Sequence, residues 1–304
     1  MKKDIDTNLV NKIIKNQIDK FDRTFTIKEL EAQALKNKQA AMKVIFKNGK
    51  ITVIRLDEKF KNNRKNYLEH FLKLVAKKYP NINTTIYCNV YDWGCHDDKD
   101  YPFFTMSGFY GTKNFVIPEY LFLRDYDKRN GRNDDKEPMN KLIEKYRNIN
   151  NWDDKISKCF FRAGTSKNKV IVNMFKNHPL VDAKWSRDSF LTYEEMFKHK
   201  YVISHYMRWD SIYFFLKSNI VVFLYNGFNQ YLWYDLFLLP GEHYIPFNNL
   251  EEFNKKIEIV KNNDVYAQKI IRRGHEMCDT YFNIDFAVDY MGLLLQEYQK
   301  LIRT

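Results

Sequence analysis

Polar residues that could do chemistry stand directly after hydrophobic, strand-like segments of this chain. Arg162 follows the strand-like run 158–161 and precedes a turn that contains Gly164. A guanidinium there can bond a diphosphate through two parallel hydrogen bonds, and a glycine lets the backbone approach the ligand closely. Thr165 and Ser166 add hydroxyl groups at the start of a further helix. A structural ion pair at the end of the strand explains Arg162 equally well.

Two more residues could take part in a reaction. Asp92 follows the strand-like segment 84–90, where a carboxylate could act as a general base with a slightly raised pKa. The simpler alternative is an Asp that bonds its own backbone in a turn before a glycine. His243 lies in a Gly-Glu-His-Tyr loop, and its ring could bond a phosphate or a sugar hydroxyl, or cap the loop.

Composition narrows the function classes. The 304 residues carry a formal charge of +12, with 50 basic and 38 acidic side chains. The basic residues are scattered and form no recognised nucleic-acid motif, so we expect no nucleic-acid partner. Asp97, Asp98 and Asp100 lack the rest of a calcium loop, and Cys88 and Cys95 have no second close pair for zinc. The sequence therefore predicts no metal site.

The sequence also lacks several well-known motifs. It contains no Gly-x-Ser-x-Gly, no phosphate loop and no Gly-x-Gly-x-x-Gly, which disfavours serine hydrolases, P-loop nucleotidases and dinucleotide enzymes. The N-terminus shows no apolar signal-peptide core, and no window reaches eighteen uncharged apolar residues. We therefore expect no integral membrane segment and a cytoplasmic location.

Strand-like and helix-like segments alternate along both halves, which predicts an α/β fold with mainly parallel sheets. Asn48-Gly49 marks a two-residue hairpin turn, and Thr192 with Glu195 has capping-box spacing. The hydrophilic run 125–137 is typical of a surface loop. The pattern predicts a hairpin over 42–56, strands over 84–90, 158–161, 201–204 and 220–225, and helices over 58–79, 141–148, 169–176, 192–198, 211–217, 250–261, 265–281 and 286–302.

Four segments, taken in order, resemble glycosyltransferase family 90, which includes lipopolysaccharide-modifying, capsule-associated and Rumi-type protein O-glucosyltransferases. They are Asn-Val-Tyr-Asp at 89–92, the Trp…Lys…Phe-Arg-Ala-Gly segment at 152–166, the Glu-x-x-x-Lys-x-Lys-Tyr entry at 192–201, and Pro-x-x-His-Tyr-x-Pro at 239–246. The resemblance departs at Ala163, where the family has Gly, and after Tyr201, where the segment is about two residues shorter.

The resemblance implies a GT-B fold with two facing Rossmann-like lobes. Residues 1–150 would form the N-terminal, acceptor-side lobe and residues 151–284 the C-terminal, nucleotide-sugar-binding lobe. Residues 285–304 would form a helix that packs back onto the N-terminal lobe. The resemblance further implies inversion at the anomeric carbon and no requirement for a bound metal.

The resemblance also assigns roles to single residues. Asp92 becomes the catalytic base, with Tyr91 and Trp93 on the acceptor side, where aromatic rings can stack against sugar faces. Arg208 takes the place of a phosphate-binding arginine of the family. The residues expected to bind the donor are Arg162, Gly164, Thr165, Ser166, Glu195, Arg208, Ser211 and His243.

The predicted reaction moves xylose or glucose from a UDP-sugar to a hydroxyl group of an oligosaccharide or lipid-linked glycan. A protein acceptor with a Ser or Thr hydroxyl is an alternative, although the chain shows neither a signal sequence nor an obvious disulfide plan. A donor such as a GDP-sugar is a second alternative. A third is a protein on the same fold that binds glycan or nucleotide without catalysis.

Overall fold

The structure is a computed structural model, and its architecture is α/β. The residues that it describes are 6–36, 41–56, 63–90, 100–129, 138–146, 151–164, 168–189, 191–204, 209–227 and 230–303.

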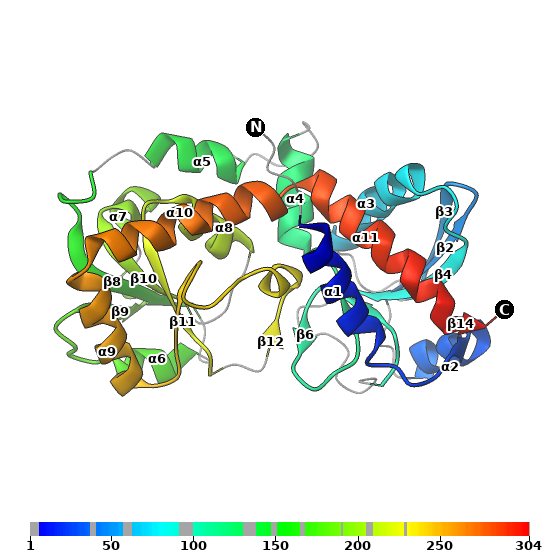
Figure 1. The fold of residues 1–304 in the computed structure, drawn as a ribbon, viewed down its shortest axis with the longest axis horizontal. Coiled ribbons are helices and arrows are strands. Elements are labelled where there is room, and N and C mark those ends of the chain that lie inside the picture. The colour runs from blue at the N-terminus through cyan, green and yellow to red at the C-terminus, as the bar shows by residue number, and fades with distance from the viewer. Residues whose placement is uncertain are drawn as a thin grey trace. The chain divides into compact units, whose positions relative to one another are not determined.

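Contacts within the chain divide it into two units (Figure 1). Unit 1 consists of Met1–Asn133, Gln230–Leu236 and Thr280–Thr304. Unit 2 consists of Asp134–Asn229 and Phe237–Asp279. Each unit contains a five-stranded sheet of its own.

The sheet of unit 2 has the strand order β13-β11-β10-β8-β9, and every neighbouring pair is parallel. Its strand β11 is a continuous apolar run, as expected for a strand covered on both faces. All six residues of β10 are buried. The strands are β8 (Ile156–Ala163), β9 (Val181–Trp185), β10 (His199–Ser204), β11 (Val221–Tyr225) and β13 (Ile245–Phe247).

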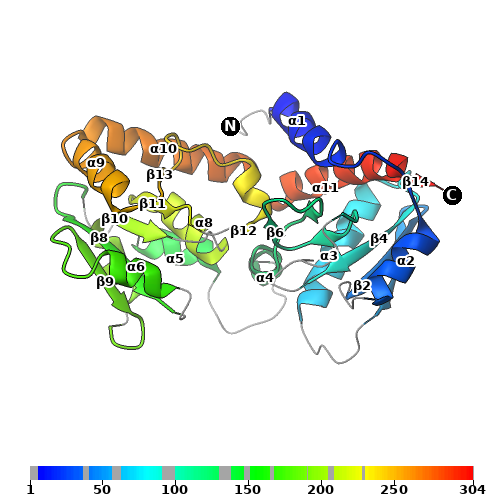
Figure 2. The ribbon, with the colours of Figure 1, turned by 90° about the horizontal axis from the view of Figure 1, so that it is seen from below.

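Helices cover both faces of this sheet (Figures 1 and 2). One face packs against α6, α9 and α10, with Phe175, Phe223 and Phe253 in a common core. On the opposite face Phe160 of β8 contacts Phe215 of α8. The helices are α5 (Met139–Tyr146), α6 (Lys169–Met174), α7 (Tyr193–Phe197), α8 (Trp209–Lys217), α9 (Leu250–Lys261) and α10 (Asp264–Tyr281).

The sheet of unit 1 is mixed, with the order β3-β2-β4-β5-β7. Asn48 and Gly49 have φ values of 51° and 72°, the left-handed pair that a two-residue hairpin turn requires, so the predicted hairpin is confirmed. Strand β2 is antiparallel to both β3 and β4, while β4, β5 and β7 are parallel. The strands are β2 (Met42–Lys47), β3 (Lys50–Arg55), β4 (Thr84–Asn89), β5 (Phe104–Thr105) and β7 (Phe115–Val116).

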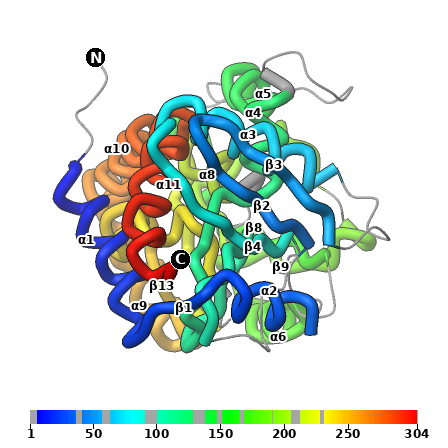
Figure 3. Tube along the Cα trace, turned by 90° about the vertical axis from the view of Figure 1, so that its right-hand side faces the viewer, coloured from blue at the N-terminus to red at the C-terminus, as the bar shows by residue number. Residues whose placement is uncertain are grey.

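The C-terminal helix α11 (Ile284–Tyr298) packs within unit 1 against α3 (Arg64–Lys78) and α1 (Thr7–Ile18). The phenol of Tyr79 donates to Asp289 on α11, and Gly292 lies so close to the Tyr79 ring that a Cβ would meet it at 2.3 Å. The last strand, β14 (Ile302–Arg303), pairs in parallel with β1 (Phe25–Thr26) (Figure 3).

Unit 1 also contains helices and strands that the sequence pattern did not reveal. Helix α4 (Tyr120–Arg129) covers the start of the run 125–137, so the predicted surface loop is wrong there. The buried Leu121 and Leu123, and Asp125 and Asp127, show that this polar stretch is packed. The other elements of unit 1 are α2 (Ile27–Lys36), β6 (Gly108–Phe109), β12 (Gln230–Tyr231), and the 3-10 helices η2 (Trp233–Leu236) and η3 (Gln299–Leu301).

The part of the chain that the structure describes contains no helix long and apolar enough to cross a membrane.

Candidate functional site

The carboxyl ends of the unit 2 strands meet at one edge of the fully parallel sheet. Along the chain, β8 is followed by its neighbour β9, and the chain then crosses to β10 on the other side of β8. This reversal makes β8 and β10 the topological switch point, outside whose carboxyl ends ligands bind in open α/β sheets. Arg162 and Gly164 stand at the end of β8, and Ser204 ends β10.

Arg162 is held by the neighbouring strand β9. One terminal nitrogen, Nη1, donates to the carbonyl oxygens of Phe161 (2.9 Å) and Asp182 (2.7 Å). The other, Nη2, donates to Asp182 Oδ2 at 2.6 Å. The Arg162 side chain is only 8% exposed, and its Nε atom has no hydrogen-bond partner among the described residues. The guanidinium is therefore fixed against the sheet.

Asp182 is the counter-ion of this arginine. Its second carboxylate oxygen accepts from Lys184 Nζ at 3.0 Å. Burial alone raises the pKa of Asp182, but the hydrogen bonds from Arg162 and Lys184 outweigh that cost and lower the pKa overall. The carboxylate therefore stays ionised and keeps Arg162 paired. The sequence left open an ion pair or a diphosphate ligand, and the structure contains the ion pair.

Gly164 has no packing role in the described fold. A Cβ built on it would meet no atom within 4 Å, so nothing there requires a glycine. Close approach of a ligand to this backbone stays a prediction. Thr165, Ser166 and Arg208 lie outside the described residues. Ser211 belongs to helix α8, which follows β10, but its side chain is outside the described part.

Glu195 closes the predicted capping box of α7. Its Oε2 atom accepts from the backbone N–H (2.7 Å) and the hydroxyl (2.8 Å) of Thr192, and its own N–H donates to Thr192 Oγ1. These bonds, first the backbone one, lower the pKa of Glu195. The capping box is thus confirmed, and a bond from Glu195 to a ribose stays a prediction.

His243 is built into its own loop. Its ring atom Nδ1 accepts a hydrogen bond from the backbone N–H of Leu239 at 3.0 Å. The backbone N–H of His243 donates to the Leu239 carbonyl. Burial is the main cause of its lowered pKa, so the ring is neutral at pH 7. This geometry fits the loop-capping alternative, and the role in donor binding stays a prediction.

Strand β4 leads toward the predicted base. Asp92, with its neighbours Tyr91 and Trp93, lies outside the described residues. The last described residue before it is Val90, whose carbonyl accepts from Arg64 Nη1 at 3.2 Å. Arg64 also stacks on the ring of Tyr120, 3.9 Å from its centroid. The first turn of α3 is therefore anchored at the carboxyl end of β4.

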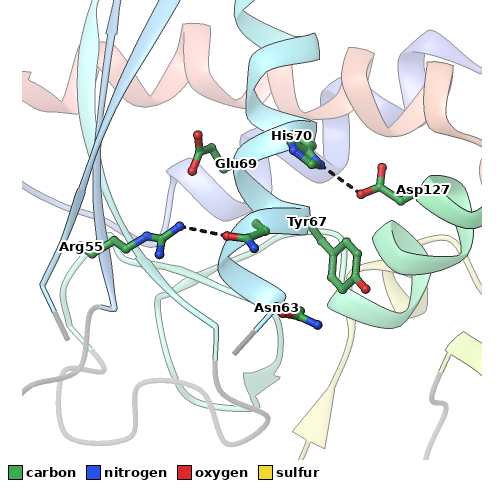
Figure 4. Close-up of a pocket in the computed structure, with 7 residues that line it drawn as sticks. Arg55, Asn63, Tyr67, Glu69, His70 and Asp127 are labelled. Atoms are coloured by element: carbon green, nitrogen blue, oxygen red, sulfur yellow. Dashed lines mark hydrogen bonds and ion pairs between the residues drawn. The ribbon is translucent and has the colours of Figure 1, made fainter. Parts of the chain in front are cut away.

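A cavity of about 250 Å³ lies in unit 1 beside this turn. Figure 4 shows Asn63, Tyr67 and His70 on one face of α3, flanked by Arg55 from the end of β3 and Asp127 from α4. His70 Nδ1 lies 3.1 Å from Asp127 Oδ2, with the two side chains 42% and 4% exposed. The full lining is Arg55, Asn63, Asn66, Tyr67, Glu69, His70 and Asp127.

The sequence pattern did not reveal this cavity, because the run 125–137 was predicted to be a surface loop and no motif marked His70. The spacing of the polar residues between 63 and 70 could have indicated a shared helix face. Asn63, Asn66, Tyr67 and His70 stand at i, i+3, i+4 and i+7, which places them on one helix face. Asp127 was beyond reach of this signal, because it comes from a helix 57 residues further along the chain.

Among the described ranges, no group of three or more His, Cys, Asp or Glu side chains is placed to hold a metal ion. The independence from metal that the sequence predicts remains a prediction.

A family model described as "Glycosyl transferase family 90" matches residues 8–304 of the chain. The chain belongs to glycosyl transferase family 90. The resemblance found in the sequence is thereby confirmed, and it extends over both units. The β8–β10 edge described above lies well inside the matched region.

One curated relative is "Protein O-glucosyltransferase 1" of Rattus norvegicus. It is 24% identical over 181 residues, which covers 50% of this chain and 44% of the relative. The chain thus matches less than half the length of this relative.

Proposed function

We propose that this family 90 chain transfers a sugar from a UDP-sugar, xylose or glucose, to a hydroxyl group of a glycan acceptor, with inversion and without a bound metal. One observation carries the proposal: the switch point of the unit 2 sheet lies between β8 and β10, where open α/β sheets bind their ligands. In this proposal the two units are the lobes of a GT-B fold, and unit 2 is the donor lobe.

The diphosphate needs positive charge as it leaves. Arg162 stands at the end of β8, and Arg208 follows β10 in the sequence. Arg162 is paired with Asp182, so its guanidinium is held in place. In this proposal it contributes positive charge at the edge of the sheet and does not move to enclose the diphosphate. Arg208, with the hydroxyls of Thr165 and Ser166, then provides the direct contacts to the diphosphate.

Asp92 is the proposed base. It removes the proton of the acceptor hydroxyl, whose oxygen attacks the anomeric carbon on the face opposite the UDP leaving group. The bond from the anomeric carbon to the diphosphate oxygen breaks with charge development like that of an oxocarbenium ion. The oligosaccharide or lipid-linked acceptor binds on the side of unit 1.

The test is a transfer assay with UDP-glucose, UDP-xylose and GDP-mannose, with chelator present and a panel of oligosaccharide acceptors. We expect turnover with a UDP-sugar alone and a product whose anomeric configuration is opposite to that of the donor, as read by NMR. Retention of configuration, or turnover only with added metal, would contradict the proposed mechanism. Turnover only with GDP-mannose would assign a different donor.

A second acceptor class is favoured by one observation, the similarity to a rat protein O-glucosyltransferase. The same assay with small folded domains that carry exposed Ser and Thr distinguishes it, because transfer would then be detected as a mass increase of one sugar on the protein. Nucleotide binding without transfer to either class would indicate a binding protein on this fold.

A further inference from the structure

The cavity beside α3 is lined by polar and charged side chains, and none of them is a predicted donor-binding residue or the predicted base. It lies wholly within unit 1, and all seven lining residues are described. We propose that this cavity binds one uncharged sugar ring of the acceptor, as a subsite apart from the reacting hydroxyl. The acceptor part of this inference rests on the proposed function, whereas sugar binding as such does not.

The His70–Asp127 pair fixes the orientation of the imidazole ring. His70 Nδ1 lies 3.1 Å from Asp127 Oδ2, so this contact occupies Nδ1 and leaves Nε2 for a ligand. A sugar hydroxyl suits Nε2 because a hydroxyl can both donate and accept. Asp127 is almost fully buried and therefore holds the ring in place rather than contacting the ligand.

Asn66 offers a hydrogen-bond donor. Its Oδ1 accepts from Arg55 Nη2 at 2.9 Å, which orients the amide so that its NH₂ group is presented as a donor. Asn63, the N-cap residue of α3, also lines the cavity. One sugar hydroxyl can accept from Asn66 while a neighbouring hydroxyl bonds Nε2 of His70.

Charge and size support a neutral ring. Arg55 is balanced by the carboxylates of Glu69 and Asp127, so the lining has no excess positive charge to attract a phosphate. A volume of about 250 Å³ lies just under the range of cavities that enclose drug-sized ligands. One monosaccharide ring suits it better than a nucleotide. Tyr67, which is buried in the core, closes the cavity wall on α3.

The position in the sheet fits the acceptor side. Arg55 is in register with Met42, and Met42 is in register with Cys88 near the end of β4. Arg64, next to Asn63 on α3, bonds the Val90 carbonyl at that end. The cavity therefore lies near the edge of unit 1 where β4 ends, and a sugar one or more units away from the reacting hydroxyl could be held there.

The experiment measures binding of methyl glycosides of glucose, galactose, mannose and xylose by saturation-transfer NMR, with no donor present and with inorganic phosphate as a separate probe. At least one glycoside should bind with a Kd of about 1 to 10 mM. Asn66→Ala and His70→Ala should each weaken it about 2- to 10-fold, the worth of one hydrogen bond. Lys77→Ala, an exposed change on the same helix, should leave binding unchanged.

Thermal midpoints of Asn66→Ala and Lys77→Ala should match the unaltered chain, since both residues are exposed, whereas His70→Ala removes the partner of the buried Asp127 carboxylate and should lower the midpoint. In transfer assays, the two cavity variants should raise the acceptor KM and leave kcat unchanged. Binding of phosphate but of no glycoside would overturn the inference. A glycoside Kd that is unchanged in both Asn66→Ala and His70→Ala would overturn it as well. Glycoside binding lost in both variants, in a chain without transferase activity, would retain the sugar site and reject the proposed function.

Discussion

In unit 2, Arg162, Glu195 and His243 each use a polar atom to bond a neighbour in the fold, namely Asp182, Thr192 and Leu239. In unit 1, Asn66 and His70 also bond neighbours, Arg55 and Asp127, but these bonds leave one polar atom of each side chain for a ligand in the cavity. The residues that a motif marks in unit 2 hold the scaffold of the edge that we propose as the donor site. The residues on α3, which no motif marks, line the cavity that we propose as a sugar site.

A residue can stand directly after a strand and still have no polar atom left for a ligand. Its place at the end of the strand can be predicted from the sequence. Whether its side chain is left for a ligand depends on the neighbouring strand or helix, since Asp182 of β9 pairs with Arg162. Four predictions test this contrast between the units.

The largest expected effect separates chemistry from nucleotide binding. Asp92→Asn should lower kcat by about 10²- to 10⁴-fold, the usual contribution of a general base, and leave the Kd for UDP unchanged. Steady-state kinetics and calorimetry measure the two quantities. Asp100→Asn, a change at an exposed carboxylate of the same stretch, is the control and should behave like the unaltered chain. Near-full turnover of Asp92→Asn would show that the base is another residue.

The next prediction concerns the buried ion pair of unit 2. Asp182→Ala leaves the mostly buried guanidinium of Arg162 without its carboxylate and should lower the free energy of unfolding by about 2 to 3 kcal/mol. That is less than for a fully buried pair, because the Asp182 side chain is 30% exposed. Lys184→Ala removes the more exposed partner and should cost less than about 1 kcal/mol. Equal losses in urea unfolding would mean that Arg162 does not depend on Asp182.

Two helix glycines compare the packing of the units. A Cβ at Gly292 of α11 would meet the Tyr79 ring at 2.3 Å, whereas one at Gly274 of α10 would meet Leu216 at 3.2 Å. Gly292→Ala should therefore destabilise the chain by about 1 to 2 kcal/mol, even after the better helix propensity of alanine. Gly274→Ala should be near neutral, because that same gain of about 1 kcal/mol offsets a slight crowding. Thermal unfolding of both variants checks this, and a neutral Gly292→Ala would argue against the close contact of α11 with Tyr79.

The smallest effect is a pH dependence in unit 2. Burial lowers the pKa of Lys155 to about 8, while its Nζ donates to the Phe197 carbonyl at the end of α7. Between pH 8 and the ordinary lysine pKa of 10.5, the unfolded chain holds this proton and the folded chain does not. The free energy of unfolding should therefore rise with pH across that window.

Lys155→Met removes this titration. The unfolding free energy of the unaltered chain, minus that of the variant, should increase by about 1 kcal/mol from pH 8 to 10.5. Lys158→Met, at an exposed position three residues further along, in β8, should show no such increase. A flat difference for Lys155→Met would mean that its amine stays hydrated in the folded chain.

Much of the fold was predictable because its signals are local. The Asn48-Gly49 turn, the Thr192–Glu195 capping box and the helix over 250–261 each depend on residues within a few positions of one another, and the structure confirms all three. Strand β9 went unpredicted because its five residues, Val-Asp-Ala-Lys-Trp, are only partly buried and too polar to read as a strand.

Because β9 was not predicted, part of the candidate site could not be predicted either. Asp182 lies on β9, so the partner of Arg162 could not be named from the sequence. The cavity of unit 1 was missed for a related reason, since Arg55, His70 and Asp127 come from three separate elements. Contacts of this range are set by tertiary packing rather than by any local pattern. The base and the phosphate-binding segments stay predictions from the family resemblance.

The most direct test of the account is a thermal-shift titration of the chain with UDP, UDP-glucose, UDP-xylose and GDP in the presence of chelator. A ligand at about 100 times its Kd stabilises a fold by roughly 2.7 kcal/mol, which is readily measured. We expect UDP and at least one UDP-sugar to raise the melting temperature, and GDP to raise it less. Stabilisation by none of the nucleotides, or by GDP alone, would contradict the assignment of the β8–β10 edge as a UDP-sugar site.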